Sequence, residues 1–402
     1  MTAPETLERI TSDCNNCGFC EAACPTFKVT YASSTGARGR VNIAKYLVQA
    51  EKSGMEPDRS FLLPFYSCLE CSACLTVCPV GIDAGQVSRM VREDLVGRGV
   101  RSKIADAIVK VTMRYESPLG LKGKMGNLLR WTEFPGRMET LLYTGQMYQL
   151  SGRSSRFSKA EELFGERISG MLGGLISRFP CLMKVASIFL GKEDKKYREA
   201  LKNITRLLSE SGVQFTVMER EPYPGTFLLD LGYEKEFRQY ASSIASKFWK
   251  LGFRKIITVD PHTYVLLKYE YPRYVEDFRL QVFYYTDLLK PEIFRRTGKS
   301  LTYHDPCHLS RGNGEVVSPL NLLNAGYDVS LPSTSGRMTG CCGGPDELLF
   351  PRLSKGISKS RYEELASTGS GTIVTACPVC LSNLAKHGRV EDVSALLVEA
   401  LK

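Results

Sequence analysis

The spacing of hydrophobic positions changes along the chain between a helical and a strand-like period. Apolar residues recur every three or four positions in residues 41–54, 100–120, 196–212 and 237–252, which predicts amphipathic helices. Short apolar runs at 187–190, 213–218 and 255–259 alternate with the last two helices and predict strands. Gly212 and Gly252 stand where a helix commonly ends. This order predicts a mostly parallel sheet with functional loops at the carboxyl ends of its strands.

No apolar run is long enough to cross a membrane. The nearest candidate, residues 171–190, is interrupted by Arg178, Pro180 and Lys184. The first ten residues have neither the basic nor the apolar stretch of a signal peptide. At 402 residues, 43% of them hydrophobic, the chain is expected to form two or three globular domains in the cytoplasm.

Positive charge is concentrated in the middle of the chain. Residues 89–202 hold 22 Lys and Arg against 12 Asp and Glu, which equals the whole net charge of +10. Such a segment is either a solvated helical linker or a docking surface for an anionic membrane face or an acidic partner subunit. No nucleic-acid partner is expected, because the sequence has no recognised nucleic-acid module.

Thirteen of the 14 cysteines fall into three spaced groups, and only Cys181 stands apart. The first two groups, in residues 14–25 and 68–79, have the same spacing, C-x2-C-x2-C-x3-C-P. Three thiolates at this spacing can wrap one cubane cluster, while the fourth points to a second cluster. Zinc is the alternative, but its sites use paired C-x2-C units. Metal ligation in a reducing compartment fits this large chain better than disulfides.

The two motifs resemble those of two-cluster ferredoxins, which exchange their fourth ligands. The resemblance implies one 4Fe–4S cluster on Cys14, Cys17, Cys20 and Cys78, and a second on Cys68, Cys71, Cys74 and Cys24. A helical insertion separates the motifs and begins with GARGR at 36–40. Arg38 and Arg40 there either contact a partner, raise a cluster potential or mark the start of a surface helix.

The third group lies near the C-terminus, in the runs YHDPCH, GCCGGPD and TACPVC. It resembles one CCG domain, a unit that occurs twice in one of the subunits of heterodisulfide reductase. The resemblance implies a third 4Fe–4S cluster, which is either of that enzyme's noncubane type or a cubane with one spare thiol. Its cysteines are Cys307, Cys341, Cys342, Cys377 and Cys380.

A second copy of the CCG unit is expected upstream, without cysteines. In this alignment Lys192 replaces the first cysteine, Tyr223 and Pro224 the paired cysteines, and Asp260 and Thr263 the last two. All five ligand positions are then lost, so this copy is expected to bind no iron.

His308 follows Cys307 directly and is the candidate catalytic residue. It is predicted to supply a proton to a substrate or quinone during two-electron reduction. Hydrogen bonding to the cluster is the alternative, and Asp305 beside Pro306 has the pattern of a helix cap. His262 is interpreted as a structural histidine.

The whole chain resembles the iron–sulfur subunits of glycolate oxidase, lactate-utilisation and anaerobic glycerol-3-phosphate dehydrogenase complexes, and fused heterodisulfide reductase subunits. It implies an α+β multidomain fold with four parts. These are a helix-rich two-cluster ferredoxin-like domain at 1–99, a basic helical linker at 100–184, a cysteine-free α/β CCG repeat at 185–290 and an intact CCG repeat at 291–402.

The resemblance also implies an electron-transfer function. The sequence has no flavin or nicotinamide fingerprint, since GMLGG at 170–174 lacks the required context. A FAD-containing dehydrogenase subunit of the 2-hydroxyacid or glycerol-3-phosphate type is therefore the expected partner, with quinone or another acceptor at the other end. A membrane anchor or the inner face of the cell membrane is a further expected partner. The alternatives are a catalytic subunit that reduces a disulfide at the CCG cluster, and an assembly scaffold.

Overall fold

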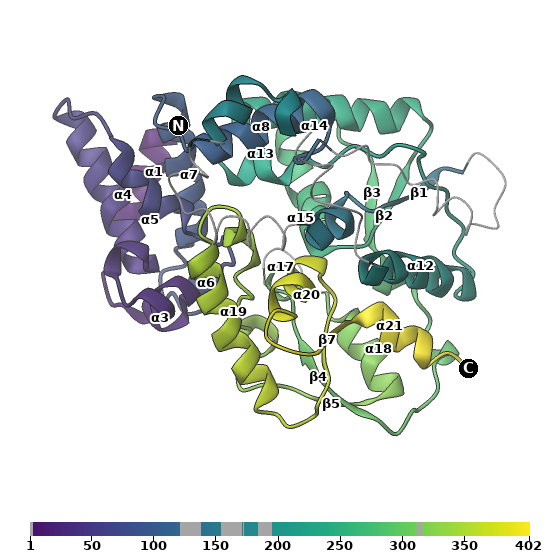
Figure 1. The fold of residues 1–402 in the computed structure, drawn as a ribbon. Coiled ribbons are helices and arrows are strands. Elements are labelled where there is room, and N and C mark those ends of the chain that lie inside the picture. The colour runs from purple at the N-terminus through teal and green to yellow at the C-terminus, as the bar shows by residue number, and fades with distance from the viewer. Residues whose placement is uncertain (1–2, 121–137, 154–170, 172, 184–194, 312–315) are drawn as a thin grey trace.

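The computed structural model describes residues 3–120, 138–153, 171, 173–183, 195–311 and 316–402. Its N-terminal part is helical, with two longer helices, α4 and α7, packed side by side (Figure 1). The elements are α1 (Ala3–Ser12), α2 (Phe19–Ala23), α3 (Pro25–Thr30), η1 (Ser33–Thr35), α4 (Ala37–Lys52), η2 (Arg59–Phe61), α5 (Leu62–Tyr66), α6 (Ala73–Thr76) and α7 (Ala84–Gly97).

The core of this part forms between the facing sides of α4 and α7. Val41, Ala44, Val87 and Val91 are buried there, together with cysteines from the adjacent loops. The carboxylate of Asp83 accepts a hydrogen bond from the backbone of Gly85 and so caps α7. The predicted helix at 41–54 is present and begins four residues earlier, as α4.

A three-stranded parallel sheet forms the middle of the molecule, in the order β1-β2-β3. Thr216 adds an isolated parallel bridge to Leu141 on the free side of β1. The elements are α8 (Lys103–Tyr115), β1 (Thr140–Tyr143), α12 (Lys195–Glu210), α13 (Thr226–Asp230), α14 (Glu234–Lys250), β2 (Lys255–Thr258), α15 (Pro261–Val265), the π-helical turn η3 (Leu266–Glu270), α16 (Tyr271–Tyr274) and β3 (Gln281–Tyr284).

This region differs from its sequence prediction in two places. Strand β1 lies within the span predicted as a helical linker. It forms a strand because it pairs with β2 and Thr216, both far along the chain, and buries Leu141, Leu142 and Tyr143 in the core. The strand predicted at 213–218 contributes only the bridge at Thr216. The strand predicted at 187–190, and Lys192, lie outside the described residues.

The amphipathic run after residue 100 forms α8 and packs on the chain itself. Ala105, Ile108 and Val109 of α8 belong to the main core cluster. Four further basic and aromatic residues of the positively charged middle segment lie outside the described residues: Lys122, Lys124, Arg130 and Trp131.

A four-stranded parallel sheet forms the C-terminal part, in the order β5-β4-β6-β7 (Figure 1). The elements are η4 (Tyr285–Leu288), η5 (Pro291–Ile293), β4 (Ser300–His304), α17 (Cys307–Ser310), α18 (Ser318–Gly326), β5 (Asp328–Ser330), η6 (Gly336–Met338), η7 (Gly344–Glu347), α19 (Pro351–Ala366), β6 (Ile373–Thr375), α20 (Pro378–Leu384), β7 (Val390–Asp392) and α21 (Val393–Glu399).

The two sheets share one hydrophobic core and the same spatial order of strands. Across the first sheet the spatial order is Thr216, β1, β2, β3, and across the second it is β5, β4, β6, β7. In both sheets the segment that comes second along the chain lies at the edge, next to the segment that comes first. Within the described residues, every helix is too short or too polar to cross a bilayer.

Candidate metal centres

Two neighbouring cavities in the N-terminal part gather its eight cysteines. Cys74 lines both cavities, so the two share a wall. A 4Fe–4S cluster requires four thiols, and each cavity has at least that number, so the residues fit that group. One cavity is lined by Cys14, Cys17, Cys20, Cys74 and Cys78, and the other by Cys24, Cys68, Cys71 and Cys74.

The backbone turns in the same way in both cysteine motifs. Asn16 and Gly18 in the first motif, and Glu70 and Ser72 in the second, have left-handed backbone, with φ between 48° and 86°. They occupy the same two positions relative to Cys14 and Cys68. This repeated conformation curls each loop so that its first three cysteines surround one cavity.

Arg40 is a buried cation beside the second cavity. Its side chain is 1% exposed. It donates to the sulfur of Cys24 at 3.7 Å, to the carbonyl of Pro64 at 2.6 Å and to the hydroxyls of Thr26 and Ser67. Arg38 instead pairs with Glu21 at 2.9 Å nearer the surface. The sequence left the roles of both arginines open, and the structure places Arg40 against a ligand loop.

The third cysteine group lies at the carboxyl ends of β4 and β6. Cys307 begins α17 after β4, Cys377 and Cys380 flank the start of α20 after β6, and Cys341 and Cys342 come from the loop before η7. All five cysteines are buried. Five thiols from three loops exceed the four that one cubane needs, so this donor set also fits a 4Fe–4S group.

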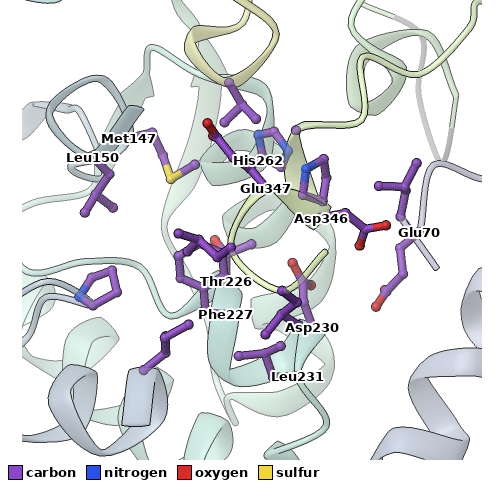
Figure 2. Close-up of a pocket in the computed structure, with 18 of the residues that line it drawn as sticks. Glu70, Met147, Leu150, Thr226, Phe227, Asp230, Leu231, His262, Asp346 and Glu347 are labelled. Atoms are coloured by element: carbon purple, nitrogen blue, oxygen red, sulfur yellow. The ribbon is translucent and has the colours of Figure 1, made fainter. Parts of the chain in front are cut away.

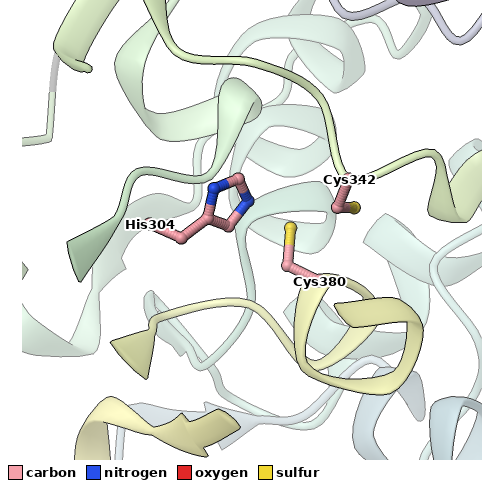
Figure 3. Close-up of side chains that lie close together, drawn as sticks. All are labelled: His304, Cys342 and Cys380. Atoms are coloured by element: carbon pink, nitrogen blue, oxygen red, sulfur yellow. The ribbon is translucent and has the colours of Figure 1, made fainter. Parts of the chain in front are cut away.

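His304 closes one side of this third group. A ring nitrogen of His304 and the sulfurs of Cys342 and Cys380 lie within 4.8 Å of one another, and Figure 3 shows the three side chains gathered from separate segments of the chain. Its Nδ1 accepts a hydrogen bond from Arg361 at 3.2 Å. The amide of Asn383 donates to the carbonyl of Cys342 at 2.6 Å. These polar contacts fix the loop and could not be read from the spacing of the cysteines.

The second and third cysteine groups touch. The thiol of Cys71 contacts that of Cys341, and Cys307 belongs to the same buried cluster. Arg311 stabilises the contact between Cys71 and Cys341. Its Nε donates to the carbonyl of Cys71 at 2.7 Å, and its Nη1 donates to the carbonyl of Thr339. Sequence reasoning missed this arginine, whose one signal is its place four residues after Cys307.

His308 lies between the third cysteine group and a cavity. Its Nδ1 is 3.5 Å from the sulfur of Cys307, and its ring centroid is 4.3 Å from that of His262. Burial alone would lower the pKa of His308, but Cys307 and Asp230 raise it to about 9. Burial lowers the pKa of His262 to about 3. Asp305 is not a helix cap, since its carboxylate accepts from the backbone of Gly336 and Pro306 precedes α17.

The cavity that His308 reaches lies between the N-terminal part and both sheets. Figure 2 shows Met147 and Leu150 on one side, Glu70 on the other, and Phe227 and Leu231 along a third wall. Cys68 also lines it. Most of its lining is apolar, and the ionisable groups gather toward the side of the cysteine groups.

The loops of the first sheet resemble the cysteine-bearing loops of the second sheet in backbone shape, but they carry no cysteine. Asp260 caps α15 before Pro261, as Cys377 precedes Pro378 at the start of α20. Gly225 (φ 95°) precedes α13 as Gly343 (φ 77°) precedes η7. The ring of Tyr223 is fully buried beside these loops. No thiol lies among these described residues, so they do not fit an iron–sulfur group.

Comparison with known protein families matches both cysteine-rich parts. Residues 10–82 match the 4Fe-4S dicluster domain family, and residues 301–385 match the cysteine-rich domain family called CCG. The chain carries both domains. The predicted 4Fe–4S cofactors, and a mixed helix and strand fold with the dicluster domain first and the CCG domain last, are thereby confirmed.

Curated relatives are iron–sulfur oxidoreductases. The chain is 31% identical over half its length to the probable iron-sulfur-binding oxidoreductase FadF of Bacillus subtilis, covering 30% of that protein. It is 25% identical over 97% of its length to the EtfAB:quinone oxidoreductase of Syntrophomonas wolfei, covering 58% of it. It is 24% identical over its whole length to a subunit of the dihydromethanophenazine:CoB–CoM heterodisulfide reductase of Methanosarcina barkeri, covering 96% of that subunit.

These relatives confirm the predicted resemblance to heterodisulfide reductase-like iron–sulfur subunits. The chain spans less than two thirds of the first two relatives' own lengths. It shares with the third nearly the complete length of both proteins.

Proposed function

We propose that this chain is the electron-transfer subunit of a redox complex. It passes electrons between a FAD-containing dehydrogenase of the 2-hydroxyacid or glycerol-3-phosphate type and quinone. The observation that carries the proposal is the contact between Cys71 and Cys341, which joins the dicluster domain to the CCG domain. Clusters bound at these cysteines supply one-electron transfer, whose rate falls steeply with distance.

The proposed cluster ligands are the cysteines of the three groups described above. Each cavity of the dicluster domain takes one 4Fe–4S cubane, the first on Cys14, Cys17, Cys20 and Cys78 and the second on Cys24, Cys68, Cys71 and Cys74. The third site takes a 4Fe–4S cluster on Cys307, Cys341, Cys342, Cys377 and Cys380, of cubane or noncubane type. Because Cys74 borders both cavities and Cys71 borders the third group, the three sites form one continuous path.

His308 is the proposed proton donor on this path. Its contact with Cys307 and its position on the cavity wall support the role. The variant His308→Asn should lose turnover and keep all its iron if the residue handles a proton. Loss of iron together with turnover would contradict the role.

The proposed partners follow from the relatives and the sequence. One relative is named as a quinone oxidoreductase, which supports quinone as the acceptor. The missing nucleotide fingerprint supports a separate flavoprotein subunit as the source of electrons. We place the complex in the cytoplasm, on the inner face of the cell membrane.

An exposed apolar stripe beside α8 supports the membrane as a partner. Residues 173–178 are helical, and Met171, Leu175 and Phe179, at four-residue intervals, are exposed. Gly173 packs against Ile104 of α8, which sets this stripe beside the basic side chains of α8. Apolar residues with a basic rim are the composition of a helix that lies in a membrane interface.

Vesicle flotation tests the membrane contact. The paired variant Leu175→Glu and Phe179→Glu should abolish binding to vesicles with anionic lipids, and Leu331→Glu, at another exposed leucine, should leave it intact. Equal flotation of both variants would contradict this face.

We further propose that the first sheet belongs to a CCG-type repeat that has lost its cysteines. The shared strand order supports a common origin, as do the matching turns at Gly225 and Gly343 and at Asp260 and Cys377. With β1 included, the repeat extends N-terminal of the expected boundary at residue 185.

The second candidate function is disulfide reduction at the CCG site. A groove between α3 and α19 reaches Cys341 and is lined by Lys28, Arg311 and Arg361, which would suit an anionic disulfide. One relative is named as part of a heterodisulfide reductase.

Purification of the native complex separates the two functions. A co-purifying protein with a flavin spectrum that reduces the clusters supports the first function, the relay of electrons from a flavoprotein to quinone. Disulfide reduction by the isolated chain, without a flavoprotein, would overturn it. Iron analysis should give about twelve atoms per chain for three clusters, whereas about eight would exclude the third site.

A further inference from the structure

The cavity between the two sheets and the dicluster domain borders two of the three cysteine groups. Cys68 of the second group lies in its wall, and His308, which contacts Cys307 of the third group, lies beside it. The degenerate repeat contributes the opposite walls, through Met147, Leu150 and Phe227 (Figure 2). A molecule in this cavity would contact Cys68 of the second cysteine group directly, and only the side chain of His308 would separate it from Cys307 of the third.

We propose that this cavity binds the ring of a quinone, a flat and neutral carrier of two electrons. The inference rests on the proposed function and names the place where the relay meets its acceptor. Three properties of the lining support this occupant: its polar groups, its charge and its separation from the cluster thiols.

The polar groups suit the carbonyl oxygens of a quinone. Nδ1 of His262 is buried without a hydrogen-bond partner among the described residues, 3.9 Å from the carboxylate of Asp260. The buried hydroxyl of Thr226 lies beside that of Tyr223. Both residues line the cavity, and the His262 ring lies against that of His308. Buried polar atoms normally find partners, so unpaired atoms on a cavity wall indicate a missing ligand or water. Met147, Leu150, Phe227 and Leu231 supply apolar wall against which the face of a quinone ring can pack.

The charge of the lining argues against an anionic substrate. Four carboxyl groups line the cavity, those of Glu70, Asp230, Asp346 and Glu347. Arg92 is the single lysine or arginine among the described lining residues, and it is already bound to Glu70 and to the carbonyls of Phe65 and Cys68. Burial raises the pKa of Asp230 to about 7. His308, the other basic side chain of the lining, faces Cys307 and Asp230. The described lining therefore offers no unengaged cation to pair with a disulfide that carries carboxylates, sulfonates or phosphates, whereas a neutral quinone needs none.

The cluster thiols of the third group lie behind the cavity wall. None of the five C-terminal cysteines is among the described residues that line the cavity, while Gly344 and Val379 beside them are. A molecule bound in the cavity would thus be separated from these thiols by the cavity wall, which suits electron exchange with a cluster held there rather than a covalent bond to a ligand sulfur. In the reaction each quinone gains two electrons that originate in the reduced flavoprotein, and two protons from water. Both of its C=O groups become C–OH groups.

A cavity-filling variant tests the site without touching a cysteine. Leu150→Trp should occupy the space of the ring, and Leu331→Trp, at an exposed leucine, is the matched control. With the holoprotein complex and a short-chain quinone, Leu150→Trp should lower kcat/KM by more than tenfold. Reduction of a soluble one-electron dye, iron content and EPR signals should match those of the control.

Direct labelling makes the test independent of turnover. A short-chain azidoquinone should attach to peptides containing residues 147–151 or 223–231 of the holoprotein, and unlabelled quinone should compete. The milder variant His262→Phe, which keeps a ring against His308 and removes the nitrogen atoms, should raise KM by several-fold and leave kcat less affected.

The outcomes distinguish the site from the relay. Full quinone turnover in Leu150→Trp, or labelling elsewhere on the protein, would overturn the cavity as the site while leaving the relay intact. Labelling of the cavity without any flavoprotein-driven quinone reduction would support the site and overturn the relay. If Leu150→Trp fails to fold, His262→Phe and the labelling pattern decide the question.

Discussion

Two ionisable side chains, Arg40 and Glu221, are buried in positions that the cysteine spacing does not reveal. Arg40 binds the loop of Cys24, and Glu221 binds the loop that follows β1. A buried charge is tolerated only where hydrogen bonds satisfy it, and both side chains are held by several donors or acceptors.

Arg40 should set the potential of the second site. Replacing it with Gln removes a positive charge next to Cys24. The reduced state, which is the more negative of the two, is then destabilised relative to the oxidised state. We expect the reduction potential of that site to fall by on the order of tens of millivolts. An EPR-monitored redox titration measures it, with Arg38→Gln, nearer the surface, as the control. An unchanged potential in Arg40→Gln with full iron content would contradict this role.

Glu221 should make stability depend on pH. Burial raises its pKa to about 7 from 4.5, although hydrogen bonds from Thr144 and Gln146 act in the opposite direction. The folded state thus keeps a proton that the unfolded chain releases. The stability from this group is complete below pH 4.5 and is lost as the pH rises through about 7.

The loss amounts to about 3 kcal/mol across that interval. Anaerobic denaturation midpoints of the native protein should fall between pH 5 and pH 8 by more than those of Glu221→Gln. The exposed Glu210→Gln serves as the control. Parallel pH profiles for the native protein and Glu221→Gln would show that the carboxyl is ionised throughout.

At the scale of elements, the same turn precedes both α13 and η7, and only the turn before η7 follows a pair of cysteines. A Cβ on Gly343 would lie 2.8 Å from the carbonyl of Ser354, and one on Gly225 would lie 3.1 Å from the ring of Tyr240. Both glycines have left-handed backbone, where a side chain costs about 1–2 kcal/mol.

The two glycines therefore form a matched pair of variants. Gly343→Ala should displace Cys341 and Cys342 and lose about four of about twelve iron atoms. Gly225→Ala should lower the denaturation midpoint by a similar amount and keep all its iron. Iron and sulfide analysis of the purified variants checks this, and equal iron loss in both would show a general folding defect.

The sequence predicted the elements whose pattern is local. The cysteine groups and the helices α4, α12 and α14 follow from spacing and periodicity, because ligands and helix faces recur at short intervals. Strand β1 was missed because its four residues are stabilised by Thr216 and β2, far along the chain. The contact between Cys71 and Cys341 and the cavity at His262 likewise depend on tertiary packing.

Across the whole molecule, single arginines join the domains. Arg311 of the CCG domain binds the carbonyls of Cys71 and Thr339, and Arg92 of the dicluster domain binds the carbonyls of Cys68 and Asp230. Tyr66 adds a hydrogen bond to the carbonyl of Leu231 at 3.1 Å. The dicluster domain is thus attached to both sheets.

Loss of Arg311 should uncouple the domains. Arg311→Met keeps most of the side-chain volume and removes the hydrogen bond to Cys71, so the distance between the second and third groups should widen. We expect flavoprotein-driven quinone reduction to fall about tenfold while dye reduction and iron content persist. Arg296→Met, at an exposed ion pair, is the control. Unaltered quinone reduction would show that apolar packing alone holds the contact.

The burial of Cys71 against Cys341 also constrains how the protein matures. Cys17 is exposed, whereas Cys71, Cys307 and Cys341 are buried in the cluster that forms where the two domains meet. Scaffold proteins that deliver iron and sulfide can therefore reach the inner sites only while the domains are apart. Cofactor loading must then come before final folding at these two sites, and a chain that closes too early would be trapped as a stable protein lacking its inner metal.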